Sequence, residues 1–248
     1  MKNMIKREGF TLAEVLITLG IIGVVAAMTI PTLISNTNGA QFKTGFKKAL
    51  STLNQAVLMN VALEDYDLSS LAASDDVDDR DARTLGYILT QRVQGASIIA
   101  DYTYPTEIKW YYDYECTAAD KTTGTAATNP CYGKDAGTDV TQTITANPTA
   151  TTYAVYQFAD GTAFGYPITA ENCTSIGGGT CYGFIDANGG NTANPNQVTV
   201  CTTGEEGGTG ATKCEVSATG VKDIFPVFYY GQSIVPGSDA AREVLFGK

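Results

Sequence analysis

The chain has 248 residues, enough for one large domain or two small ones, and 44% of them are hydrophobic while only 17% are charged. Its net charge of −10 repels phosphate backbones, so no specific nucleic-acid partner is expected. Six cysteines and no histidine favour an exported, disulfide-bonded protein over a cytosolic one, and the closely spaced ligand pairs of a zinc site are missing.

An apolar segment runs from Phe10 to Ile30 and contains a single charged residue, Glu14. At about 20 residues it is long enough to cross a hydrocarbon layer of about 30 Å as a helix, so we expect a membrane span. Three basic residues precede the segment, and three follow it before residue 49. The positive-inside rule alone therefore does not fix its orientation.

Glu14 is the unusual residue of this segment. An acidic group inside a membrane span costs about 2.5 to 3.5 kcal/mol on insertion scales for the comparable aspartate, so it needs a partner. A conventional secretory signal is cut after its apolar part, and Val24–Ala27 offers small residues for such a cut. A signal peptide that is removed after export gains nothing from a buried carboxylate, so Glu14 argues against that interpretation.

The sequence KREGFTLAEVLITLGIIG at positions 6 to 23 resembles the class III signal of type IV prepilins and pseudopilins. The resemblance implies that a prepilin peptidase cuts after Gly9 and methylates the new amino terminus on Phe10. Glu14 then lies five residues into the mature chain, where that family has its glutamate. Gly23 and Pro31 coincide with positions where many pilins carry a helix-weakening glycine and proline.

Cleavage between Gly9 and Phe10 would create a cationic amine at the edge of the apolar segment. This amine is a candidate partner for Glu14, and a neighbouring subunit shifted along the helix axis is better placed to supply it than the same chain. In a low dielectric such a pair fixes the register, whereas an unpaired Glu14 is penalised. We therefore expect Glu14 to act in assembly.

The helix is expected to continue beyond the span, because apolar residues recur at helical spacing between Phe42 and Val61. Pro31 should bend or locally open it, since proline lacks the donor to the carbonyl four residues back. Two helices separated by a loop at residues 35–39 are the alternative. The expected organisation is a leader (residues 1–9), a membrane-spanning and filament-core half-helix (10–34), an amphipathic half-helix (35–63) and an exported head (64–248).

The head begins with an acidic connector at residues 64–83, followed by a second helix at about 81–94. Residues 153–158 and 162–168 alternate around Asp160-Gly161, which predicts a β-hairpin. Further strands are expected at residues 109–114, 182–186, 197–201 and 223–230, with Pro226 at an edge or a bulge. Loops are expected at residues 117–150, 175–180 and 188–196. The predicted fold class is α+β: a long N-terminal α-helix packed on an antiparallel β-sheet head with disulfide-bracketed loops.

The six cysteines border these loops. Six cysteines allow 15 pairings, and the sequential one is favoured because closing short loops costs the least entropy. The expected disulfides are Cys116–Cys131, Cys173–Cys181 and Cys201–Cys214.

The C-terminal part contains a pattern of residues 183–189, 195–196 and 223–225 that is similar to one in many pilin-like proteins associated with type II secretion. Residues 197–221 interrupt it. Asp186, Asn188 and Asp223 offer oxygens of the kind that calcium prefers, and calcium is the only cofactor considered. A turn and strand cap built from the same residue types is the alternative.

The resemblance implies a structural subunit of a type IV pilus or related filament, and no enzyme. Its expected partners are itself or other pilins, the prepilin peptidase and an inner-membrane assembly platform. It would be a single-pass inner-membrane precursor first and a periplasmic or extracellular filament later. A type II secretion pseudopilin is the alternative within the same chemistry.

A second alternative belongs to another class: a secreted module with a conventional signal peptide that binds glycans or surfaces. Its site would use the aromatic residues Trp110, Tyr111, Tyr112 and Tyr114. Aromatic residues at strand spacing more often form core and cross-strand contacts.

Overall fold

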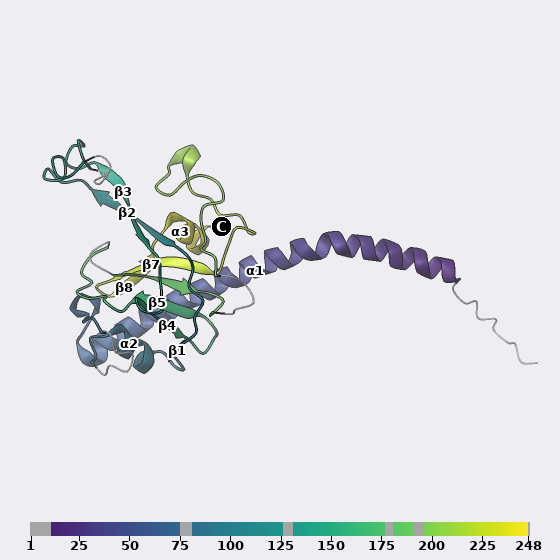
Figure 1. The fold of residues 1–248 in the computed structure, drawn as a ribbon, viewed down its shortest axis with the longest axis horizontal. Helices are drawn as coiled ribbons and strands as arrows, with labels where there is room; N and C mark the ends of the chain where they lie inside the picture. The colour runs from purple at the N-terminus through teal and green to yellow at the C-terminus, as the bar shows by residue number, and fades with distance from the viewer. Residues whose placement is uncertain (1–10, 75–80, 126–130, 177–180, 191–195, 248) are drawn as a thin grey trace, which may run out of the picture. The chain divides into compact units, whose positions relative to one another are not determined.

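The computed structural model describes residues 11–74, 81–125, 131–176, 181–190 and 196–247. The chain divides into two compact units, the first ending at Asn38 and the second beginning at Gly39. The described part of the first unit is the beginning of helix α1 (Leu12–Glu64), and the second unit contains the rest of α1 and all other elements (Figure 1).

Helix α1 is assigned without interruption from Leu12 to Glu64, so the alternative of two helices with a loop at residues 35–39 is wrong. Gly23 and Pro31 lie inside α1, and neither ends it. Proline removes a single helical donor, and the bonds of the neighbouring turns hold a helix across such a gap. A weakening of the helix at these two residues stays a prediction.

The second unit is built on a six-stranded antiparallel sheet with the order β1-β4-β5-β6-β7-β8. The predicted hairpin is confirmed as β4 and β5, with Tyr156 opposite Phe164, and the strand predicted at residues 182–186 is β6. The strands are β1 (Ser97–Ile98), β4 (Tyr153–Gln157), β5 (Ala163–Pro167), β6 (Tyr182–Asp186), β7 (Ile224–Tyr230) and β8 (Ser233–Pro236).

Both faces of this sheet are buried, and alternate residues of each strand face opposite layers. One face packs on α1 and α2 (Leu85–Arg92), where Phe46 of α1 stacks on Phe225 of β7 with ring centroids 4.2 Å apart. The other face packs on strands β2 (Ile108–Glu115) and β3 (Asp139–Ala146). The central strands are therefore apolar on both sides, whereas strands of an antiparallel sheet with one solvent-exposed face alternate apolar and polar residues.

Strands β2 and β3 form a separate two-stranded ribbon, drawn in teal in Figure 1. Trp110 of β2 is fully buried, and its Nε1 donates to the carbonyl of Gly183 at 2.7 Å. The expectation of a loop throughout residues 117–150 is wrong, because β3 lies within it. Val140, Thr143 and Ile144 have β-branched side chains, which favour strands, although many of the other residues in 117–150 are polar.

Two strand expectations near the C-terminus are corrected. Residues 197–201 form no strand but a single parallel bridge, from Val198 to Ile224. Pro226 lies in β7, an inner strand, and not at an edge. Proline lacks the N–H that a sheet hydrogen bond needs. It is tolerated here because Pro226 lies between two partners of β7: Val198, which bridges to Ile224, and β8, whose first pair is Val227 with Pro236.

Three short helical elements were not expected. The C-terminal helix α3 (Asp239–Phe246) follows β8, and its N-cap Ser238 accepts a hydrogen bond from Ala241 N at 3.0 Å. The other two are single turns of 3₁₀-helix, η1 (Leu68–Ser70) and η2 (Gly210–Thr212).

Candidate functional site

Glu14 lies in the first turn of α1 and is bound by Thr11. Its Oε2 accepts hydrogen bonds from Thr11 N and Thr11 Oγ1, both at 2.8 Å, and its own N–H donates to Thr11 Oγ1 at 3.3 Å. This reciprocal pattern is a capping box, in which a threonine N-cap and a glutamate three residues later satisfy each other's free groups. The sequence Thr-Leu-Ala-Glu at residues 11–14 carries this signal, and our sequence analysis missed it.

The expected cleavage and methylation residues, Gly9 and Phe10, lie outside the described residues. Directly after them, α1 presents an apolar surface from Leu12 to Pro31 with a mean hydropathy of 2.2. None of this segment is buried by the described residues; Ile17, for example, is 63% exposed. By length and composition the segment is able to cross a membrane.

All six cysteines form disulfides, and the pairing is the sequential one that was expected: Cys116–Cys131, Cys173–Cys181 and Cys201–Cys214. The first closes a loop at the end of the β2–β3 ribbon. The second is buried in the core that the sheet forms with α1 and α2. Cys201 is the only one of the six residues that is more than 2% exposed.

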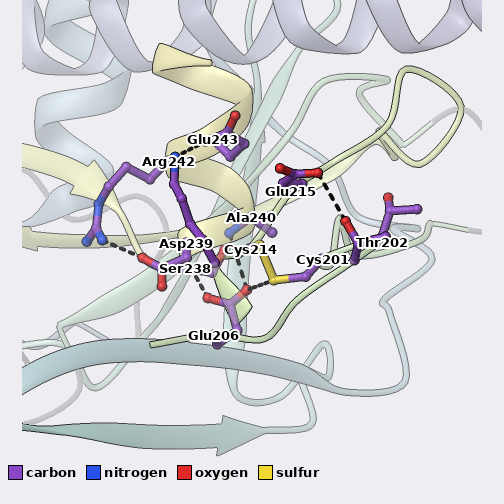
Figure 2. The surroundings of a disulfide bond; sticks show 12 residues. Cys201, Thr202, Glu206, Cys214, Glu215, Ser238, Asp239, Ala240, Arg242 and Glu243 are labelled. Atoms are coloured by element: carbon purple, nitrogen blue, oxygen red, sulfur yellow. Dashed lines mark hydrogen bonds and ion pairs between the residues drawn. A yellow bond between two sulfur atoms is a disulfide. The ribbon is translucent and has the colours of Figure 1, made fainter. Parts of the chain in front are cut away.

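The loop closed by Cys201–Cys214 is fastened to the start of α3 by two carboxylates (Figure 2). Glu206 accepts hydrogen bonds from the N–H groups of Asp239 at 2.5 Å and Ala240 at 3.2 Å. In return, Asp239 Oδ2 accepts from Gly207 N at 2.8 Å. The positive end of a helix stabilises such charges, although burial raises the pKa of Glu206.

Glu206 also lies close to both sulfurs of this disulfide, and Cys201, Glu206 and Cys214 form the one cluster of metal-ligand types among the described residues. Metal ions bind the thiolate form of cysteine, and a disulfide has no thiolate. The cluster is therefore a structural contact between a carboxylate and a disulfide.

Asp186 is the centre of a buried turn. Its Oδ1 accepts from Asn188 N at 2.7 Å and Gly189 N at 3.0 Å, and its Oδ2 accepts from Gly190 N at 2.9 Å and Tyr102 Oη at 2.8 Å. Burial raises the pKa of Asp186, while these four donors act in the opposite direction. The carboxylate thus holds a turn in which Gly189 and Gly190 have left-handed φ angles of 67° and 73°.

Asp223 also binds a main-chain N–H group, because its Oδ1 accepts a hydrogen bond from Gln197 N at 2.7 Å. Asp186 and Asp223 are close enough for the charge of Asp186 to raise the pKa of Asp223, after the larger effect of burial. This is the turn-and-cap arrangement that competed with calcium binding. A calcium ion at Asp186, Asn188 and Asp223 would have to displace these donors, and calcium binding stays a prediction that melting in excess calcium would test.

The aromatic residues considered for a surface site do not share one platform. Trp110 is in the core, Tyr112 packs edge-on against Phe228 with centroids 5.7 Å apart, and Tyr114 donates to Asp120 at 3.0 Å. Tyr111 lines a cavity. The cross-strand and core roles therefore dominate.

Residues 4–30 match the Prokaryotic N-terminal methylation motif, which is the prepilin-type signature of type IV pilins and pseudopilins. No curated protein and no solved structure matches the chain. The motif supports a pilin-like or pseudopilin subunit that a prepilin peptidase processes and that assembles into filaments. Together with the apolar start of α1, it fits a single-pass inner-membrane precursor.

Proposed function

We propose that the chain is a structural subunit of a type IV pilus or a related pilin-like filament. It is inserted in the inner membrane as a prepilin, cleaved after Gly9, methylated on Phe10 and assembled through the first half of α1. The observation that carries this proposal is the methylation motif at residues 4–30, followed directly by an apolar helix that no described residue covers. Surface of this kind is stable only in lipid or against other apolar helices.

The head supports display outside the cytoplasm. Three disulfides persist in oxidising compartments, and two of them close exposed loops of the head. A surface filament makes more use of such loops than a filament confined to the periplasm. This favours a pilus subunit, while a type II secretion pseudopilin is the second candidate because it shares the signal and the helix.

Two measurements on the protein from its native envelope test the proposal. The intact mass should correspond to a chain that begins at Phe10 with a methylated amine, and antibodies against the head should decorate filaments on intact cells. A chain that begins near Ala27 would contradict the proposal and favour a soluble exported module. Correct processing with filaments that appear only in the periplasm would favour the pseudopilin.

A further inference from the structure

A groove crosses the head between residues 105–111, which lead into β2, and residues 197–202. Two adjoining cavities of about 350 Å³ and about 590 Å³ make up the groove, and they share Glu107, Val198, Val200 and Cys201. Volumes of this size accommodate side chains of a bound molecule. Val200 lines both cavities and is 61% exposed.

One wall of the groove is an open main-chain edge. Thr199 N donates to Ile224 O at 2.9 Å, and Ile224 N donates to Gln197 O at 3.0 Å, so these groups face β7. Alternate residues of an extended segment point their main-chain groups to opposite sides, so those of Val198 and Val200 point away from β7. Within the described part of the chain they have no main-chain partner.

This edge is held rigidly. Thr199 is 1% exposed, its Oγ1 donates to Lys222 O at 3.0 Å, and it accepts from Lys222 N at 2.9 Å. The Cys201–Cys214 disulfide and the contact of Glu206 with α3 fix the segment that follows (Figure 2). Because this edge is already fixed, it loses little conformational entropy when another strand pairs with it.

The smaller cavity has a distinct chemistry. Its lining contains three acidic residues, Glu107, Glu205 and Glu206, against one basic residue, Lys109, which is paired with Glu107 at 3.1 Å. Tyr111 supplies an aromatic surface, and Val198 and Pro226 supply aliphatic ones. Tyr111 and Glu206 line the same cavity, and burial and then the charge of Glu206 raise the pKa of Tyr111.

We propose that the groove binds an extended, positively charged segment of another protein. The main chain of the guest pairs with the edge at Val198 and Val200, and one of its arginine or lysine side chains enters the smaller cavity beside Tyr111, Glu205 and Glu206. Aromatic and carboxylate groups together select a cation with an aliphatic stem.

The occupant is a different protein and not a second copy of this chain. The chain carries a net charge of −10, so two heads repel each other. Several of its own lysines are already engaged with acidic residues of the head, as Lys48 is with Asp160 at 3.1 Å and Lys121 with Asp135 at 2.7 Å. A basic partner complements the smaller cavity in charge, because three carboxylates there face the single Lys109.

The test uses the full chain in detergent micelles and titration calorimetry with the peptide acetyl-Thr-Val-Arg-Val-Thr-amide. Two matched peptides separate the two contacts: one with citrulline in place of arginine, which keeps the shape without the charge, and one with alternate main-chain nitrogens methylated. We expect saturable binding of the arginine peptide and at least about tenfold weaker binding of both others. Hydrogen exchange at Val200 should slow only with the arginine peptide.

Variants locate the site. Glu205→Gln should weaken binding of the arginine peptide about fivefold or more, whereas Asp113→Asn, which removes an exposed charge of the same head outside the groove, should change it less than about twofold. Equal binding of the citrulline peptide, or equal effects of the two variants, would overturn the proposal in favour of general electrostatic attraction. Failure of the arginine peptide to bind, or binding that a second copy of the chain displaces, would overturn it as well.

Discussion

Asn54 of α1 pairs with Ile234 of β8 through both ends of its amide. Its Oδ1 accepts from Ile234 N at 2.9 Å, and its Nδ2 donates to Ile234 O at 3.0 Å, as a neighbouring strand would. Because β8 is the last strand of the sheet, this side chain satisfies part of an edge that would otherwise be open to other chains. The contact also fixes the second half of α1 against the sheet.

Replacing Asn54 by Ala should lower the free energy of unfolding by about 1 to 3 kcal/mol, because Ile234 loses both partners at a half-buried site. Trp110 is the only tryptophan and is buried, so its fluorescence reports denaturant unfolding of the full chain in micelles. Gln55→Ala, an exposed position one residue later, is the matched control and should cost little. Equal stabilities of the two variants would show that the Asn54 contact is not used.

Limited reduction should open Cys201–Cys214 before the other two disulfides, because Cys201 is the only one of the six cysteines that is more than 2% exposed. Alkylation and peptide mapping after mild reductant identify the opened pair. The double variant Cys201→Ser with Cys214→Ser should lose about 2 to 4 kcal/mol of stability. Alkylation of any cysteine in the denatured, unreduced protein would contradict the three-disulfide structure.

The buried Asp223 should make stability depend on pH in a defined direction. Burial raises its pKa in the folded state above the ordinary value of 3.8, so the unfolded state loses its proton first as the pH rises. The stability that Asp223 contributes is therefore fully present below 3.8 and is lost as the pH rises through the folded pKa. As the pH rises from 3.8 through the folded pKa, the unfolding free energy of the wild type should therefore fall relative to that of Asp223→Asn. A difference that grows with pH would contradict this account.

Strong periodicity was enough to predict the centre of the fold. Phe46, Leu50, Leu53 and Val57 recur at helical spacing and do line the core, and the alternation at residues 153–158 correctly gave β4. The cysteine spacing predicted the pairing, because short loops close at the lowest entropic cost. In each case the signal is local and repeats over several residues.

The elements that were missed depend on tertiary contacts. Strand β8 has four residues, too few for a period, and it is held by β7 and Asn54. Residues 197–201 look like a strand, but they form a single bridge, from Val198 to Ile224. The groove joins segments about 90 residues apart in the chain, and no local pattern relates residues at such a distance.

Glu14 has two candidate roles that can be separated. In the structure it completes a capping box with Thr11, a contact that contributes about 0.5 to 2 kcal/mol to a helix start. In the proposed filament its charge neutralises the Phe10 amine of a neighbouring subunit, and loss of one partner from a buried pair costs about 3 to 5 kcal/mol. Glutamine at position 14 keeps the capping box, because its amide oxygen can accept the same bonds, but it carries no charge.

Glu14→Gln should therefore leave the helix start, leader cleavage and membrane insertion intact, and insertion should even improve because no carboxylate enters the hydrocarbon. Assembly with wild-type subunits should fail, because each Phe10 amine would enter the filament without a countercharge. Thr11→Ala is the matched control: it removes the local partner and keeps the charge, so its subunits should be cleaved and should assemble. Filament yield and leader cleavage, measured together by imaging and immunoblotting, decide between the roles. If Thr11→Ala blocks assembly while Glu14→Gln permits it, Glu14 acts through the capping box, and the paired-charge account is wrong.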